Sequence, residues 1–441
     1  MSVINFRPAK AKGSRQRAAE ETNIVAALDV GSTKVSCLIA ERMRSRPAEQ
    51  EPAARQKLRI RGSGHQASGG VRAGVVVDIE AADRAIRLAV EAAERMAGVR
   101  IGEVIVSVAG GRPRCEVYSG ETRVMTADVG PADMQRAISS ALQKLDGRGR
   151  AVLHATPVQY HIDDAHGVRQ PLGMFGQALS VDVNAVTVEP GAIRNLGLAI
   201  GRCHLDIANY VIAPYAGARA VLVDDEMALG VTYVEMGGST TGIAAFCEGR
   251  LIFADVIPVG GQHITNDIAR GLSTSIAHAE RLKTLYGSAL PASDDDREHV
   301  VVPLLGELGV DKVHRLPRSM LTGIIRPRVE EILELVRDRL ALSPFGALAG
   351  DRIVLGGGAS QLTGLREAAG LVLNRLVRTG LPRGLYAMPE NARIPGFSVA
   401  MGLLDYAMRP DRQIWNLPAG RAAPAEGNYI FRVGKWIKES F

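Results

Sequence analysis

VTYVEMGGSTTGIAAFCEGRLIFADVIPVGG, residues 231–261, is the stretch from which the architecture of this chain can be inferred. Apolar runs at 231–236 and 243–246 flank a turn of glycine, serine and threonine, and Glu248-Gly249 leads into a third run at 251–257. Short apolar runs separated by glycine turns are typical of buried antiparallel strands. Glycine lets backbone N–H groups approach an anion, and hydroxyls add donors. The pattern predicts either a phosphate-binding hairpin, with Glu235 placed to hold a metal through water, or an ordinary hairpin turn.

A second stretch of the same form, NIVAALDVGSTKVSCLIAER, occupies residues 23–42. An apolar strand ends in an acid and is followed by glycine, hydroxyl residues and a second apolar strand, about 200 residues before the first example. One such loop is a weak signal. Two in the same order indicate a duplicated phosphate clamp in which one hairpin from each half of the chain closes on a triphosphate.

A third element, DRIVLGGGASQLTGL at 351–365, reads as a strand, three glycines and the start of a helix, with Ser360 or Thr363 as a cap. The order of these elements resembles the actin, Hsp70 and sugar-kinase ATPase superfamily. That resemblance implies an α/β actin-like fold, with two lobes of duplicated sheet around a nucleotide cleft, and ATP and Mg²⁺ as cofactors. The residues it assigns to the cofactor are Asp29, Gly31, Ser32, Thr33, Lys34, Glu235, Gly237, Gly238, Ser239, Thr240, Thr241, Glu280, Lys283, Gly356, Gly357, Gly358 and Ser360, with Asp29 and Glu235 holding the metal through water.

Composition sets limits on the class of protein. The 441 residues suffice for two or more domains. The net charge of +6 is mild and diffuse, so no nucleic-acid partner is expected. Four widely spaced cysteines without a CxxC pair indicate reduced thiols. No signal peptide is expected at the start, and no apolar run reaches the roughly 18 residues of a membrane span.

Composition and periodicity divide the chain into segments. Residues 131–145 read as a helix flanked by short alternating strands, and 316–342 contain a long amphipathic helix with Pro327 expected in its first turn. The expected segments are a disordered basic tail (1–22), a first lobe (23–109 and 189–230), an inserted α+β subdomain (110–188), a second-lobe core (231–262 and 343–408), a helical subdomain (263–342), a linker (409–427) and an amphipathic helix (428–441).

The insertion narrows the resemblance. Together with GVRQPLGMFG (167–176), YVIAPYAGARAVLVDDEMALG (210–230) and the last residues, it resembles the FtsA family of actin-like bacterial cell-division proteins over almost the whole chain. That family implies a peripheral protein at the septum, on the cytoplasmic face of the inner membrane. It implies head-to-tail filaments, tethering of the FtsZ ring and recruitment of later divisome proteins. FtsZ is expected to bind around Arg326 and Glu330. The alternative is that these charged residues only form a solvated helix face, which would have the same sequence.

The last residues, NYIFRVGKWIKESF at 428–441, predict a helix with one apolar and one basic face. Such a helix suits an anionic headgroup layer, whereas packing on the core is the alternative. The residues assigned to the membrane are Tyr429, Ile430, Phe431, Val433, Lys435, Trp436, Ile437, Lys438 and Phe441, of which Phe431 departs from the apolar face.

Departures from the superfamily pattern bear on activity. In the second loop Glu235 replaces an aspartate, Ser239 a glycine, and Gly242 stands where a second acid is common. Losing that acid weakens water activation, so ATP binding with slow or no hydrolysis is expected. A pilus-assembly relative and a sugar-kinase-type phosphotransferase remain as alternatives. The segment HIDDAH (161–166) contains metal-binding residue types, although solvated polar side chains are the simpler interpretation.

Overall fold

The computed structural model describes residues 23–43, 58–146, 149–305, 313–343, 349–383 and 393–408. The predicted basic tail (1–22), linker (409–427) and membrane helix (428–441), with all nine residues assigned to it, lie outside these ranges. Within them, no helix is both long and apolar enough to cross a bilayer.

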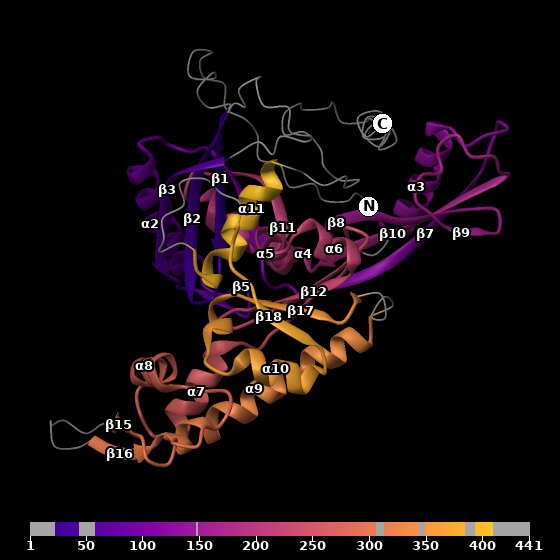
Figure 1. Ribbon diagram of the computed structural model, residues 1–441. Coiled ribbons are helices and arrows are strands. Elements are labelled where there is room, and N and C mark those ends of the chain that lie inside the picture. Colours follow the sequence, from indigo (N-terminus) through magenta and orange to yellow (C-terminus); the bar gives the residue numbers. More distant parts are fainter. Residues whose placement is uncertain are drawn as a thin grey trace.

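Two five-stranded sheets with the same strand order form the centre of the molecule (Figure 1). The first contains β11 (Asp206–Ile212), β6 (Glu103–Val108), β1 (Ile24–Val30), β2 (Lys34–Arg42) and β3 (Leu58–Ala67), in that order. The second contains β18 (Leu376–Thr379), β17 (Arg352–Gly356), β12 (Val231–Met236), β13 (Thr241–Cys247) and β14 (Arg250–Ile257). The central strand of the first sheet, β1, pairs antiparallel with β2 and parallel with β6. The central strand of the second, β12, likewise pairs antiparallel with β13 and parallel with β17. This repeated topology confirms the predicted actin-like fold.

The hairpin register places the two acids at equivalent positions. Asp29 pairs with Ser36 one residue before the end of β1, and Glu235 pairs with Gly242 one residue before the end of β12. Both strands are almost entirely buried because their apolar side chains lie between layers of helices. Each acid therefore stands where a buried strand meets its glycine loop.

Helices cover both faces of the first sheet. On one face, α2 (Ile79–Ala97) packs against β3 and α4 (Pro190–Gly201) and is capped by Asp78, whose carboxylate accepts from two backbone N–H groups. On the other face lie α5 (Ala213–Val221) and α11 (Ser398–Met408). The sequence prediction assigned all of 343–408 to the second lobe, but α11 packs against β1, β2, β6 and α5 of the first. The apolar side chains of α11 are buried there, so the chain returns from the second lobe to the first before the described residues end.

The inserted subdomain lies between β6 and α4 and projects to one side (Figure 1). It contains β7 (Arg114–Arg123), α3 (Pro131–Asp146), β8 (Ala151–Ile162), β9 (Ala165–Val168) and β10 (Ala178–Val188), with a core of its own. It also contacts the second sheet, because the buried Asn184 donates its side-chain N–H to Leu251 O of β14 at 3.1 Å. The insertion therefore touches both lobes.

A helical subdomain covers the far side of the second sheet (Figure 1). Its elements are α7 (Gly261–Gly271), α8 (Ile276–Tyr286), β15 (His299–Pro303), β16 (Val313–Pro317) and α9 (Arg318–Ala341). Pro327 lies inside α9 and not in its first turn, so that expectation was wrong. The helix begins earlier than expected, at Arg318, because apolar residues such as Leu321 and Ile325 are already buried there. The remaining short elements are β4 (Val71–Arg72), β5 (Val75–Val76), α6 (Asp224–Leu229), α10 (Leu365–Leu373), η2 (Gly358–Gln361) and η4 (Pro395–Phe397).

Candidate functional site

The two glycine loops are in direct contact. Ser239 Oγ donates a hydrogen bond of 2.5 Å to Ser32 Oγ, from the second loop to the first. A methyl group on Gly238 would lie 2.3 Å from Thr33 Cγ2, so the glycine allows the Thr33 side chain to pack against the second loop. Ser32 Oγ also accepts from Gly74 N at 3.2 Å. Two segments that the sequence pattern paired thus meet between the lobes.

The two loops fold alike. In the first, Gly31 N donates to Lys34 O at 3.0 Å, and in the second Gly237 N donates to Thr240 O at 2.9 Å. Each turn therefore begins with a glycine whose N–H closes onto the carbonyl three residues later. Thr241 follows, with its hydroxyl donating to Val259 O at 2.8 Å. The duplication seen in the sequence extends to backbone hydrogen bonds.

Both predicted carboxylates are half-buried behind the loops. Asp29 accepts a hydrogen bond of 2.7 Å from Ser107 Oγ, and Glu235 accepts one of 3.2 Å from the hydroxyl of Tyr233. Burial raises the pKa of both carboxyls, and the charge of Asp29 raises the pKa of Glu235 further, to well above its usual range. Lys34 opposes both shifts, which means that the two acids and one ammonium form a single electrostatic cluster.

Lys34 is held by groups from the end of the described chain. Its Nζ donates to Gly396 O at 2.6 Å and lies 3.6 Å from the centroid of the Phe397 ring. Burial lowers the pKa of Lys34, while the neighbouring carboxylates Asp29 and Glu235 raise it.

The third glycine element packs on the second loop. Gly357 has a φ of 80° and approaches the backbone of Met236, since a methyl group there would lie 2.5 Å from Met236 O. Gly356 ends β17, Gly358 begins η2, and the hydroxyl of Ser360 donates to Gly357 O at 2.8 Å. The three glycine elements are therefore contiguous.

The Glu280 and Lys283 pair lies on α8 beside these loops. Lys283 Nζ donates to Glu280 Oε2 at 2.7 Å and to Gly261 O at 3.1 Å. Gly261 in turn lies against Ala359 of the third element, with only 2.9 Å between its would-be methyl and Ala359 Cβ. Both residues thus lie where the second and third loops meet.

The start of α7 supports the second loop through contacts that the sequence pattern did not reveal. Gly261 N donates to Gly237 O at 2.9 Å, and Gln262 N donates to Gly238 O at 2.6 Å. A methyl group on Gly260 would lie 2.6 Å from Gly237 O. The sequence pattern does not identify Gly260, Gly396 and Phe397 as supporting residues, because each lies 20 or more positions from the loop that it contacts. For Gly260, the Val-Gly-Gly sequence at 259–261 is the local sign of a close approach.

The remaining predicted positions lie elsewhere. Arg326 and Glu330 form an exposed ion pair of 2.7 Å on α9, in the helical subdomain. In the insertion, His161 Nδ1 and His166 Nδ1 face each other at 2.9 Å while Asp182 holds His161 Nε2 at 3.1 Å. No group of three or more histidine, cysteine, aspartate or glutamate side chains suited to a metal ion occurs in the part of the chain that the structure describes.

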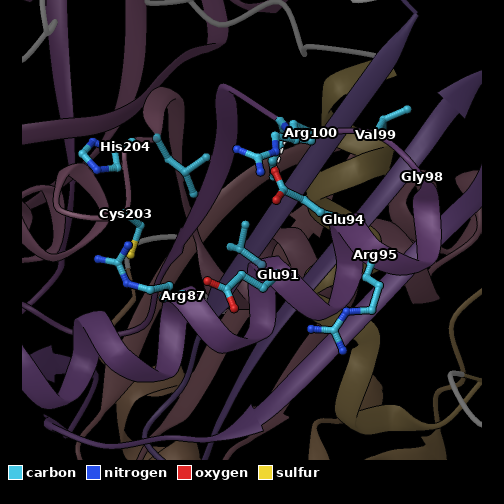
Figure 2. Close-up of a pocket in the computed structure, with 12 residues that line it drawn as sticks. Arg87, Glu91, Glu94, Arg95, Gly98, Val99, Arg100, Cys203 and His204 are labelled. Atoms are coloured by element: carbon cyan, nitrogen blue, oxygen red, sulfur yellow. Dashed lines mark hydrogen bonds between the residues drawn. The ribbon is translucent and has the colours of Figure 1, made fainter.

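A cavity of about 680 Å³ lies on the first lobe, away from the loops. Figure 2 shows its lining, where Arg87 of α2 lies beside Cys203, with Glu91 and Arg95 further along the same helix. It lies at the beginnings of β6 and β11, the end of the sheet opposite to Asp29. This cavity is therefore separate from the three loops.

Comparison with known proteins shows similarity to one family over almost the whole chain. The profile of "Cell division protein FtsA" matches residues 232–402, and that of the "SHS2 domain inserted in FTSA" matches 110–187. The chain is 44% identical to cell division protein FtsA of Agrobacterium fabrum, over 96% of each chain. It is 43% identical to that of Rhizobium meliloti, again over 96% of each. The protein of Escherichia coli K12 is 30% identical over 96% of this chain and 99% of its own.

Solved structures of low sequence identity share the fold. The PilM–PilN type IV pilus biogenesis complex has a TM-score of 0.60 at 15% identity, covering 87% of this chain and 98% of that one. MreB5 of Spiroplasma citri bound to ADP has a TM-score of 0.53 at 12% identity, covering 88% and 98%. These similarities establish the actin-like architecture.

Proposed function

The chain belongs to the FtsA family of cell division proteins, and we propose that it is an ATP-binding, actin-like scaffold that tethers the FtsZ ring to the cytoplasmic membrane. One observation carries the nucleotide part of this proposal. Two glycine and hydroxyl loops from sheets of identical topology meet at the Ser32–Ser239 hydrogen bond, with Asp29 and Glu235 directly behind them. The MreB5 neighbour binds ADP on the same architecture, which agrees with this assignment.

The loops have the chemistry of a phosphate cradle. Added methyl groups on Gly31 and Gly237 would lie 2.8 Å and 3.0 Å from carbonyl oxygens of their own turns, and one on Gly238 would lie 2.3 Å from Thr33 of the other loop. The turns are therefore tight and have no side chain at these positions. The other N–H groups of such turns, with the hydroxyls of Ser32, Thr33, Ser239 and Thr240, favour anionic oxygens. Thr241 would join them on giving up its hydrogen bond to Val259 O. The Ser32–Ser239 contact must open for phosphates to enter between the loops. Glu280, Lys283 and the third glycine element would then face the nucleoside.

The donor set also fits Mg²⁺. Mg²⁺ prefers oxygen ligands, retains several waters and is commonly bound through one or two carboxylates plus substrate phosphates. Asp29 and Glu235 supply two half-buried carboxylates whose pKa is raised by burial, and a bound cation would favour their charged forms. We propose that they hold the metal through its waters, and that the metal offsets the phosphate charge. The absence of an acid at Gly242 still favours slow or no hydrolysis.

The proposed tethering function gives a role to three further parts of the chain. The amphipathic pattern at 428–441 supports binding to anionic lipid, and many weak helices on one filament would hold by avidity. We propose that the insertion contributes to head-to-tail filament contacts, which do not close. The exposed Arg326–Glu330 pair is the proposed contact region for FtsZ, and later divisome proteins would be recruited by the assembled filament.

Mg²⁺-dependent ATP binding by the full chain tests the proposal. We expect calorimetry to show ATP binding that weakens when Mg²⁺ is omitted, and Asp29→Asn to remove most of that dependence on the metal. Asp164→Asn is the matched control, because this exposed aspartate lies in the β8–β9 turn of the insertion. Binding with equal affinity with and without Mg²⁺, or an Asp29→Asn protein identical to wild type, would contradict the assignment.

A further inference from the structure

The side chain of Lys34 has unusual partners for a residue in a phosphate loop. Its ammonium donates to the carbonyl of Gly396 at 2.6 Å and stands 3.6 Å above the ring of Phe397. A cation close over an aromatic face gains electrostatic stabilisation, and more so when water is excluded. Lys34 is half-buried, so these two groups replace much of its hydration.

The partner segment is itself fixed in place. Phe397 is buried, and its ring contacts His65 edge-on with centroids 6.0 Å apart. The position where Gly396 would carry a methyl lies 3.5 Å from Lys34 Nζ and 3.8 Å from Gly358 Cα. The η4 turn therefore lies between the first phosphate loop and the third glycine element, and it contacts the first lobe at Lys34 and the second at Gly358.

From these contacts we infer that Phe397 and Gly396 hold Lys34 in the nucleotide-free protein and compete with nucleotide phosphates for its ammonium. Phe397 is thus a positioning residue that acts through Lys34. This inference deepens the proposed nucleotide function and rests on it. A phosphate carries the opposite charge, so it is a stronger partner for the ammonium than a ring and a neutral carbonyl are.

The competition has a structural consequence for α11. Ser398, the first residue of α11, directly follows Phe397. Gly402 of α11 packs on α5 so closely that a methyl there would lie 1.6 Å from Ala216 O. Because this contact leaves no room for sliding, a shift of η4 on release of Lys34 moves α11 and α5 together. Nucleotide binding would then be transmitted to this helix pair on the first sheet, of which α5 also contacts β12, β13 and β14 of the second.

Two variants remove the ring while keeping an apolar side chain, namely Phe397→Leu and Phe397→Met. Phe253→Leu is the matched control, since Phe253 is a comparably buried phenylalanine on β14. The first readout is the rate of reductive methylation of Lys34 in nucleotide-free protein, followed by peptide mass spectrometry. We expect a rise of roughly threefold or more when the ring is lost. The control should leave the rate unchanged.

The second readout is ATP affinity by calorimetry, and its sign separates the possible outcomes. Because the Phe397 ring competes with phosphates for Lys34, its loss should increase ATP affinity by about the same factor as the rise in methylation rate. If Phe397 has only a structural role, the variants should bind ATP more weakly than wild type. An unchanged methylation rate, or weaker ATP binding in both folded variants, overturns the inference. If wild-type protein does not bind ATP at all, the proposed nucleotide function fails, while a faster methylation rate would still establish that Phe397 holds Lys34. Where the leucine variant does not fold, the methionine variant carries the same test.

Discussion

Replacing Gly260 by alanine probes how the second loop rests on α7. The added methyl would lie 2.6 Å from Gly237 O, 2.9 Å from Gly238 O and 2.9 Å from Thr240 N. Non-bonded heavy atoms gain most at about 3.5–4.0 Å, so all three approaches are repulsive. Because every one of these atoms belongs to the backbone, rotation of a side chain cannot relieve the overlap. The loop must move away from α7.

The expected cost follows from these contacts. Overpacking of this kind costs roughly 1–3 kcal/mol. The displaced loop also loses the hydrogen bonds from Gly261 N and Gln262 N, of 2.9 Å and 2.6 Å, each worth about 1 kcal/mol net. We therefore expect the free energy of unfolding to fall by about 3–5 kcal/mol. ATP affinity should fall at least about tenfold, because a loop displacement costing more than about 1.4 kcal/mol must be reversed on binding.

Urea unfolding followed by circular dichroism measures the first effect, and calorimetric titration with ATP·Mg the second. Gly191→Ala is the control, because a methyl there meets nothing within 4 Å and Gly191 lies in the first turn of α4. Alanine should leave stability unchanged or raise it by up to about 1 kcal/mol at that position. The reasoning is refuted if Gly260→Ala unfolds at the wild-type urea concentration and binds ATP equally well.

Other predictions concern charge, membrane and partner. The folded state holds a proton on Glu235 more tightly than the unfolded chain does, so wild-type stability should fall as pH rises above about 4.5 through the raised pKa. Glu235→Gln cannot lose stability in this way, so the urea midpoint of the nucleotide-free variant should exceed that of wild type by a margin that grows with pH. A margin that stays constant with pH would contradict this. Removing residues 428–441 should abolish sedimentation with anionic liposomes, and unchanged sedimentation would disprove membrane binding by that segment. Arg326→Ala should weaken FtsZ co-pelleting while changing stability by less than about 1 kcal/mol, because the pair with Glu330 is exposed; unaltered co-pelleting would move the FtsZ surface elsewhere.

Local pattern was sufficient for the hairpins and for the insertion. Glycine, hydroxyl and acid recur at fixed spacing in both loops, and the two acids occupy the same register in both hairpins. The helix expected at 131–145 appears as α3 at Pro131–Asp146. Such features depend on neighbours within a few residues, so the sequence contains the information directly.

Contacts between distant segments could not be predicted in the same way. Lys34 and Gly396 are 362 residues apart, and Asp29 and Ser107 are 78 apart. Nothing in the letters around Phe397 indicates a lysine above its ring. Periodicity likewise shows that α11 is apolar, but it does not show which of the two sheets this helix packs against. Supporting residues of the site were therefore missed even where its loops were identified.

A crystal structure with a non-hydrolysable ATP analogue and Mg²⁺ tests the central claim most directly. The account predicts that the Ser32–Ser239 hydrogen bond opens, that phosphates lie between the two loops, and that Asp29 and Glu235 face one hydrated metal ion. A nucleotide bound elsewhere, for example in the cavity beside Arg87, with the two serines still joined, would contradict it.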